Sequence, residues 1–169
     1  MAGKLQNKIA LVTGASKGIG RATVELFAEH GAEVFCPARS RDKLEELKRQ
    51  LEQKGARIHI KQTDLGKSSE IEELFKFISD HVDYLDSVVN CAGNFEGGRI
   101  DEISVEDFDK VISMNLRSPF LICKHAIPLL KKSGAGTIVN ISSLSGCVGL
   151  PKFEGFGPYD ISKYGLWGL

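Results

Sequence analysis

The sequence has no excess of charge of either sign. Lysine and arginine number 22, and so do aspartate and glutamate, which makes the formal net charge zero at pH 7. Domains that bind nucleic acid usually carry a clustered basic excess, so we expect no nucleic-acid partner. Hydrophobic residues make up 42% of the 169 residues, which is typical of a folded domain with its own core. We therefore expect a single domain over residues 1–169.

Long apolar runs are also missing from the sequence. The apolar stretch of the N-terminal segment, IALV at residues 9–12, has the length of a strand and is too short for a signal peptide. No run approaches the roughly 18 apolar residues that a membrane-spanning helix needs. These absences predict a cytoplasmic protein without a membrane partner.

Groups suited to disulfide bonds or metal ions are few. The four cysteines are far apart in the sequence and form no CxxC pair, which predicts reduced thiols in or near the core. They are Cys36, Cys91, Cys123 and Cys147. The four histidines show no metal-ligand spacing, so we expect no metal site.

Apolar runs of strand length alternate with amphipathic helical segments along the chain. The expected strands lie within residues 8–14, 32–38, 57–64, 84–93 and 136–143. The expected helices cover residues 18–31, 41–55, 68–80 and 104–132, and a further helix begins near Tyr159. Such alternation implies parallel strands joined by crossover helices, and continuous apolar runs indicate strands buried on both faces. We expect an α/β fold: a Rossmann-like, doubly wound parallel sheet with strand order 3-2-1-4-5.

The stretch TGASKGIGR at residues 13–21 places three glycines between the first expected strand and the first expected helix. Glycine permits a tight turn and a close approach of the backbone to a ligand. The free N–H groups and the dipole at a helix start favour an anion there. The spacing of Gly14, Gly18 and Gly20 differs from both GxGxxG and the P-loop. We interpret the stretch as a pyrophosphate-binding turn, and a purely structural turn is the alternative.

The end of the second expected strand bears on the choice of dinucleotide. An NAD site normally has an acidic residue there, which binds the ribose 2′-hydroxyl. In this sequence Ala38 occupies that place and Arg39 follows it. The planar donors of arginine match a 2′-phosphate, and Lys17 can add a second positive charge. These residues predict NADP(H) rather than NAD(H), although Lys17, Arg39 and Arg41 could instead be solvated surface charges.

Tyr159 and Lys163 lie four residues apart and so share one face of the last expected helix. A phenol titrates near pH 10, and a neighbouring ammonium group favours its ionised form. The lysine can also donate to a nicotinamide ribose. An amphipathic surface pair is the alternative. Ser143, at the end of the fifth expected strand, could hydrogen-bond a substrate carbonyl oxygen as charge develops on it.

Asn115 lies within the long helical segment, where asparagine has no propensity advantage. Pro119, four residues later, has no N–H group. The backbone carbonyl of Asn115 therefore loses its usual partner within the helix. The sequence predicts a free carbonyl at this position, and a simple helix kink is the alternative.

Together these features resemble the classical short-chain dehydrogenases/reductases over residues 8–169. The matching pieces are TGASKGIG at 13–20, NCAG at 90–93 in place of the family's NNAG, Asn115, Ser143 as the second serine of the SS pair, and YDISK at 159–163. The resemblance implies that NCAG packs beside the cofactor and steadies the sheet, and that the Asn115 carbonyl holds a water linked to Lys163. It also implies that Asp64 lies near the adenine, although Asp64 could instead cap the helix after it.

The resemblance implies two overlapping sets of site residues. The catalytic set is Asn115, Ser143, Tyr159 and Lys163. The cofactor-binding set is Gly14, Ser16, Lys17, Gly18, Ile19, Gly20, Arg39, Ser40, Asp64, Leu65, Asn90, Ala92, Gly93, Tyr159 and Lys163.

Two expectations concern the C-terminal part of the sequence. Ser143 lies 16 residues before Tyr159, a few more than is usual in the family, and the extra residues in 150–158 predict a longer loop beside the active site. The resemblance also leads us to expect a fragment of a domain of about 250 residues, with Leu166, Trp167 and Leu169 exposed by the loss of the rest. The full-length form is expected to be a homodimer or homotetramer.

Three functions are compatible with these observations. The first is an NADP(H)-dependent oxidoreductase that interconverts a small-molecule carbonyl and an alcohol. The second is a truncated, non-catalytic dinucleotide-binding module. The third is a regulatory or structural α/β protein that binds no nucleotide. The sequence leaves the identity of the substrate open.

Overall fold

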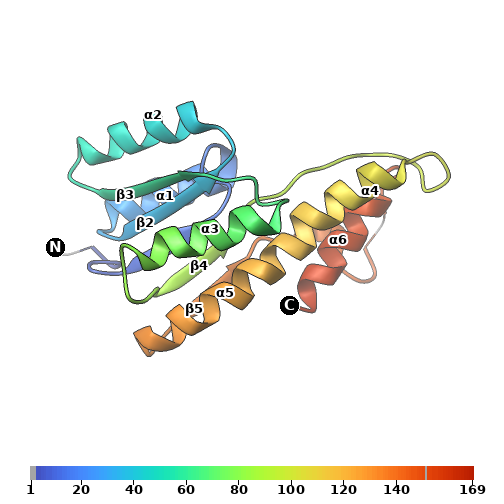
Figure 1. Ribbon diagram of the computed structural model, residues 1–169. Coiled ribbons are helices and arrows are strands. Elements are labelled where there is room, and N and C mark those ends of the chain that lie inside the picture. The colour runs from blue at the N-terminus through green and yellow to red at the C-terminus, as the bar shows by residue number, and fades with distance from the viewer. Residues whose placement is uncertain (1–2, 151) are drawn as a thin grey trace.

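A five-stranded parallel sheet lies at the centre of the molecule (Figure 1). In the computed structural model, which describes residues 3–150 and 152–169, the strand order is β3-β2-β1-β4-β5. The strands are β1 Ile9–Val12, β2 Glu33–Ala38, β3 Arg57–Gln62, β4 Ser87–Asn90 and β5 Thr137–Asn140. All neighbouring strands are parallel, which confirms the expected Rossmann-like, doubly wound α/β fold. Met1 and Ala2 of the N-terminal segment, and Pro151 of the expected longer loop, lie outside the described residues.

Helices cover both faces of the sheet. They are α1 Gly18–Glu29, α2 Arg41–Glu52, α3 Ser68–Ser79, α4 Val105–Ile112, α5 Ser118–Ser133 and α6 Gly157–Trp167. Successive strand residues point to opposite faces, so Leu11 packs in a core with α3 and α5, and Val12 packs in a second core with α1 and α2. Figure 1 shows α6 beside α4, on the arm that extends away from the sheet.

The expectation that every strand is buried on both faces is wrong for the two edge strands, β3 and β5. Val139 of β5 is 42% exposed. It pairs with Val89 and so faces the same side as α1 and α2, which pack over β1, β2 and β3. The central strand β1, by contrast, is buried throughout, because both neighbouring strands and both helical layers cover it.

The long helix expected over residues 104–132 consists of α4, a π-helical turn at Ser113–Arg117 and α5. Ser104 caps α4 by accepting a hydrogen bond from the N–H group of Asp107 at 3.1 Å. Asn115 lies in the middle of the π-helical turn. Its carbonyl oxygen cannot accept a hydrogen bond from Pro119, because proline has no N–H group. The N–H group of Ser118 bonds to the carbonyl of Ser113 instead. The simple kink that we considered is therefore a widened helical turn.

The end of the chain shows one difference from the expectation. Trp167 and Leu169 are exposed, as we expected, but Leu166 is only 4% exposed. Leu166 lies one turn after Ser162 and Lys163, which are also buried, so it belongs to the inward face of α6.

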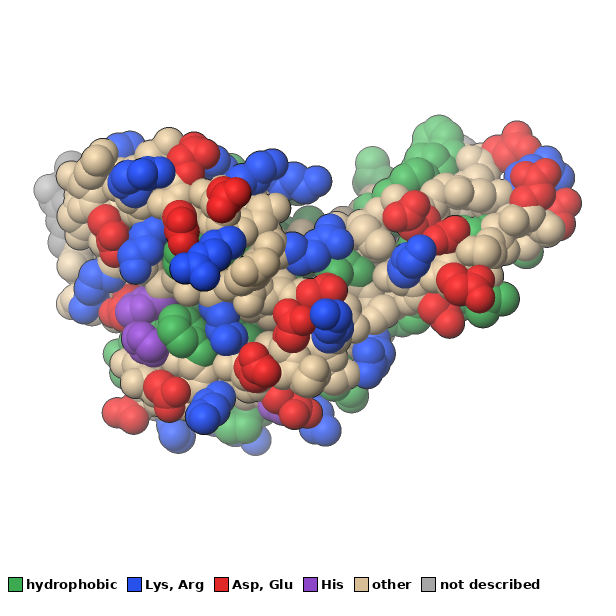
Figure 2. Space-filling model, turned by 45° about the horizontal axis from the view of Figure 1, so that its top comes forward, with side chains coloured by type: hydrophobic (Ala, Val, Ile, Leu, Met, Phe, Trp, Pro, Cys, Tyr) green, Lys and Arg blue, Asp and Glu red, His purple; other side chains and the backbone are tan. Residues whose placement is uncertain are grey.

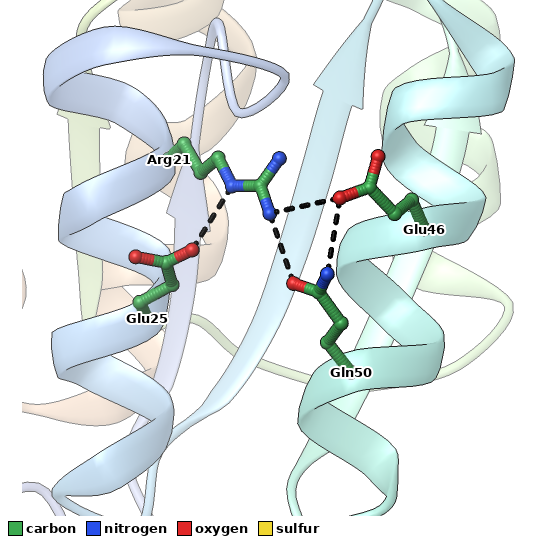
Figure 3. Close-up of polar contacts among 4 residues, drawn as sticks. All are labelled: Arg21, Glu25, Glu46 and Gln50. Carbon is green, nitrogen blue, oxygen red and sulfur yellow. Dashed lines mark hydrogen bonds and ion pairs between the residues drawn. The ribbon is translucent and has the colours of Figure 1, made fainter.

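A polar network joins α1 to α2 close to the start of α1 (Figure 3). The Nε atom of Arg21 donates to Glu25 at 2.9 Å, within α1. Its Nη2 atom donates across to Gln50 at 2.9 Å and to Glu46 at 3.3 Å, both on α2. Gln50 also donates to Glu46 at 3.0 Å. Arg21 thus holds the two helices that follow β1 and β2 in a fixed relation.

We expect Arg21→Met to lower the free energy of unfolding by about 1 kcal/mol, because methionine retains apolar packing but loses the bonds that join the helices. Urea denaturation measures this change. Arg41→Met is the matched control, since Arg41 is exposed and its side chain bonds to Glu45 of its own helix, and it should leave the unfolding free energy nearly unchanged. Equal effects of the two substitutions would contradict the bridging role of Arg21.

Candidate functional site

A cleft of about 340 Å³ opens at the carboxyl ends of the strands. Its walls come from the loop after β1, the start of α2, the connections after β3 and β4, and the π-helical turn. The lining residues are Gly14, Ser16, Lys17, Gly18, Ile19, Gly20, Ala38, Arg39, Ser40, Lys43, Thr63, Leu65, Cys91, Ala92, Gly93 and Met114. The cleft lies where the strand order reverses between β1 and β4, which is the usual ligand position in open α/β sheets.

Two glycines make the floor of the cleft possible. A Cβ atom on Gly20 would lie 2.4 Å from the carbonyl oxygen of Gly14, so the start of α1 sits directly against the turn. Gly14 has a φ of +69°, and its Cβ would lie 2.9 Å from Cα of Ala92. Thr13 joins the same two loops, because its hydroxyl oxygen accepts from the N–H groups of Cys91 and Ala92, each at 3.1 Å. The backbone of the cleft is therefore held rigidly on both sides of β1.

All the charged side chains that line the cleft are basic. Lys17, Arg39 and Lys43 line it, and its lining contains no aspartate or glutamate. All three side chains are exposed, and none of them has an ion-pair partner within residues 3–150 and 152–169. On the outer surface of the molecule, by contrast, basic and acidic side chains are interspersed (Figure 2). The cleft is therefore suited to an anionic ligand.

Most residues predicted to bind the cofactor line this cleft, but Asp64, Asn90, Tyr159 and Lys163 do not. The carboxylate of Asp64 accepts from the N–H group of Gly66 at 3.1 Å and shapes the turn before α3. Asp64 is not the N-cap of that helix, because the cap position belongs to Lys67. Asn90 is buried and donates to the side chain of Asn140 at 2.8 Å, a bond that joins β4 to β5.

The prediction missed several residues that line the cleft. Lys43 lies four residues after Arg39, a spacing that could have indicated a shared face at the start of α2. Thr63 and Met114 each lie next to a residue that the prediction included. Cys91 replaces an asparagine of the family motif, and burial raises the pKa of its thiol. The thiol therefore stays protonated and adds no charge to the cleft.

The structure brings Tyr159 and Lys163 together on α6. The Nζ atom of Lys163 lies 5.6 Å from the centre of the Tyr159 ring. It donates to the carbonyl oxygen of Ile141 at 2.8 Å, at the end of β5. Lys163 is only 6% exposed, and its burial lowers its pKa below the usual value. The lysine is thus held in one position beside the tyrosine.

Asn115 joins three segments through its side chain. Its amide oxygen accepts from the N–H group of Asn94 at 2.9 Å, and its amide nitrogen donates to the carbonyl of Asn94 at 2.9 Å. The same nitrogen lies 3.1 Å from the hydroxyl of Ser162 on α6. Sequence reasoning considered only the backbone carbonyl of Asn115 and missed these bonds. The side chain is what connects the π-helical turn to the connection after β4 and to α6.

Ser143 lies on a loop that packs against α6. Its hydroxyl oxygen accepts from the N–H group of Ser145 at 3.2 Å and caps a short 3-10 turn at Leu144–Gly146. A Cβ atom on Gly146 would lie 2.7 Å from the carbonyl oxygen of Lys163. Ser142 donates to that same oxygen at 3.4 Å. The loop that bears Ser143 is therefore fixed to the turn of α6 that bears Lys163.

The described part of the chain has neither a membrane-spanning helix nor a cluster of metal ligands. Within residues 3–150 and 152–169, no helix combines the length and apolarity needed to cross a membrane. In the same residues, no three histidine, cysteine, aspartate or glutamate side chains gather as they would around a metal ion. All four cysteines are free thiols.

The comparisons with known proteins agree on one family. The sequence matches the family model for short chain dehydrogenases over residues 8–169. An uncharacterized oxidoreductase of Thermotoga maritima is 38% identical over 164 residues, which cover 97% of this chain and 63% of the relative. The uncharacterized oxidoreductase YxbG of Bacillus subtilis is 37% identical, over 85% of this chain and 53% of its own length. The chain thus spans roughly three fifths of the length of these curated relatives.

Solved structures agree with the sequence comparison. The alcohol dehydrogenase of Thermococcus sibiricus, complexed with 5-hydroxy-NADP, superposes with a TM-score of 0.89 at 30% identity, over 95% of this chain and 67% of that one. A metagenomic short-chain oxidoreductase in complex with NADP gives a TM-score of 0.90 at 32% identity, over 97% of this chain and 73% of that one.

The close approach of α1 to the first turn leads to a prediction about Gly20. We expect Gly20→Ala to lower the free energy of unfolding by about 2–4 kcal/mol, because the added methyl group overlaps backbone atoms that cannot move aside. Gly18→Ala is the matched control within the same turn. Gly18 has a φ of +56° and open space around it, so alanine there should cost only about 1–2 kcal/mol of conformational strain. Thermal or urea unfolding measures both, and a smaller loss for Gly20→Ala than for Gly18→Ala would contradict the packing argument.

Proposed function

Because the chain belongs to the short-chain dehydrogenase family, we propose that it forms the cofactor-binding part of an oxidoreductase that uses NADP(H) to interconvert a carbonyl and an alcohol. The observation that carries this proposal is the cleft itself. It combines a glycine turn at the start of a helix with Lys17, Arg39 and Lys43, and its lining contains no carboxylate. Relatives of known structure bind NADP or a modified NADP.

The residues of the cleft fit a phosphorylated dinucleotide. The turn from Gly14 to Gly20 leaves N–H groups at the start of α1 free to bind a pyrophosphate. Arg39 and Lys43 follow β2, where a carboxylate would otherwise bind the ribose 2′-hydroxyl. A 2′-phosphate there would meet positive charge instead of repulsion, and Lys17 would add to that charge from the opposite side of the turn.

The chain's own residues provide the acid–base part of the proposed reaction. NADPH bound in the cleft would supply the hydride that reduces the carbonyl carbon. Tyr159 gives its hydroxyl proton to the carbonyl oxygen, which becomes the alcohol. The charge of Lys163, 5.6 Å from the tyrosine ring, stabilises the negative charge left on the phenol. Ser143 orients the substrate oxygen, and Asn115 keeps α6 in place through Ser162.

The proposal extends to the partners of the whole protein. A small carbonyl or alcohol is the substrate, and the full-length form assembles as a homodimer or homotetramer. The non-catalytic alternative has less support, because the chain retains both Tyr159 and a Lys163 that is buried and held by the Ile141 carbonyl. Turnover measured with the protein and its tyrosine variant separates the two readings.

The cofactor preference can be tested at Arg39. Arg39→Ala should weaken NADPH binding about tenfold, because a charge-assisted hydrogen bond to the 2′-phosphate is lost. NADH binding should change little, since NADH lacks that phosphate. Thermal shift titrations with both nucleotides measure the two affinities. Arg41→Ala, which lies outside the cleft, is the control, and an equal loss for NADPH and NADH would show that Arg39 does not bind the 2′-phosphate.

The catalytic role can be tested at Tyr159. Tyr159→Phe should reduce kcat for carbonyl reduction by at least about 100-fold, because the hydroxyl that gives its proton to the substrate oxygen is lost. NADPH binding should be unaffected. Tyr164→Phe is the matched control on the same helix, since the Tyr164 hydroxyl donates to the Cys147 carbonyl at 2.8 Å, and it should retain the greater part of the activity. Undiminished reduction by Tyr159→Phe would refute the mechanism.

A further inference from the structure

Two phenylalanines, Phe95 and Phe156, lie beside the ring of Tyr159, and a third, Phe153, packs against Phe156. We call these three residues the aromatic wall. The Phe95 ring lies 5.5 Å from the Tyr159 ring, centre to centre, in an edge-to-face arrangement. The Phe156 ring lies 6.3 Å from it, nearly perpendicular. Phe95 and Phe156 are 4.7 Å apart, and Phe153 lies 5.4 Å from Phe156. The wall is thus continuous and ends at the proposed proton donor.

Two residues of the aromatic wall are exposed to a degree that is unusual for phenylalanine. Phe95 is 47% exposed and Phe153 is 66% exposed. Leu144 and Val148, on the same loop as Phe153, are 76% and 87% exposed. Isolated apolar residues on a surface need no explanation, but a contiguous group of them marks a binding site for an apolar ligand or partner.

The two segments that supply the wall are locked together. Phe95 belongs to the connection after β4, whereas Phe153 and Phe156 belong to the longer loop before α6. The N–H group of Gly98 donates to the carbonyl of Gly155 at 2.9 Å. Arg99 forms a 2.7 Å ion pair with Glu154. Gly155 has a φ of +77°, a conformation that glycine adopts without strain. The wall is therefore built before any ligand arrives.

Charged side chains line the pocket beside Phe153: Arg99, Asp101, Lys152, Glu154 and Asp160. Arg99 and Glu154 satisfy one another, and Lys152 donates to the carbonyls of Ser145 and Cys147. The aromatic wall itself presents only ring carbon atoms to a ligand. A charged substituent packed against the Phe95 and Phe156 rings would lose water without gaining a hydrogen bond from those rings.

We propose that the aromatic wall is the substrate-binding surface and that it selects carbonyl compounds with a flat, apolar group, above all an aryl group. This inference rests on the proposed function, because it requires the substrate oxygen to meet the Tyr159 hydroxyl. A substituent on that carbonyl lies next to rings that surround Tyr159 at 5.5 and 6.3 Å. Ring pairs at centre distances of about 4.5–7 Å attract one another beyond simple burial, so an aryl ketone or aldehyde gains more from the wall than an alkyl one.

The test compares benzaldehyde with propanal as substrates of the full chain and NADPH. We expect a higher kcat/KM for benzaldehyde, and we expect Phe95→Leu to reduce the benzaldehyde-to-propanal ratio by about 5–10-fold. Phe153→Leu, at a more exposed position, provides a second variant whose folding is less at risk and should reduce the ratio in the same direction. Phe120→Leu is the control, because Phe120 is 53% exposed on α5 and lies outside the wall, and it should keep the ratio of the unaltered protein.

A binding measurement separates failure of this inference from failure of the proposed reaction. Saturation-transfer NMR with benzyl alcohol and propanol, in the presence of NADP⁺, reports contact with the protein without turnover. Contact with benzyl alcohol that Phe95→Leu removes, in the absence of any carbonyl reduction, would support the aromatic wall and overturn the reaction. Reduction of both aldehydes with a ratio that neither variant alters would overturn the wall and support the reaction. Burial of the wall by a second copy of the chain, seen as concentration-dependent association that Phe153→Leu abolishes and no contact with benzyl alcohol, would also overturn it.

Discussion

The candidate site depends on the hydrogen bonds of one buried side chain, that of Asn115. It is 1% exposed, and its amide group bonds to both backbone polar groups of Asn94 and to Ser162. A buried amide without partners is costly, so these bonds oblige three segments to stay together. The connection after β4 borders the cleft, and α6 bears Tyr159 and Lys163. One amide thus fixes the border of the cleft relative to the helix that bears Tyr159 and Lys163.

The π-helical turn explains how that amide reaches its partners. Pro119 cannot donate within an α-helix, and the backbone widens over Ser113–Arg117 where the usual bond is missing. The widened turn places Asn115 inward and Met114 at the wall of the cleft. Burial of Lys163 costs stability, since burial disfavours its charged form and lowers its pKa, and the carbonyl of Ile141 offsets part of that cost. The regular helical hydrogen bond at Asn115 and the solvation of Lys163 are both lost near the place of the proposed chemistry.

Much of the fold and part of the site follow from local sequence patterns. The alternation of apolar runs and amphipathic segments predicts the parallel sheet, because each pattern needs only neighbouring residues to form. The glycines at 14, 18 and 20 predict a turn that leaves N–H groups free, since glycine's backbone freedom belongs to the residue itself. Arg39 was identified because it directly follows a strand. Lys43 was missed although it lies four residues after Arg39, because that spacing indicates a shared face but does not show that this face borders the cleft.

The sequence by itself determined the order of the elements, the glycine turn at the start of α1 and the placement of Tyr159 and Lys163 on one helix face. These depend on spacings of a few residues, which backbone geometry fixes directly. Only the tertiary structure decided which groups bond to Asn115 and that Phe95 packs against Phe156. It also decided that Asp64 and Asn90 do not line the cleft. Those contacts join segments far apart in the chain, and they form only where packing and the need to satisfy buried polar groups select one arrangement among many.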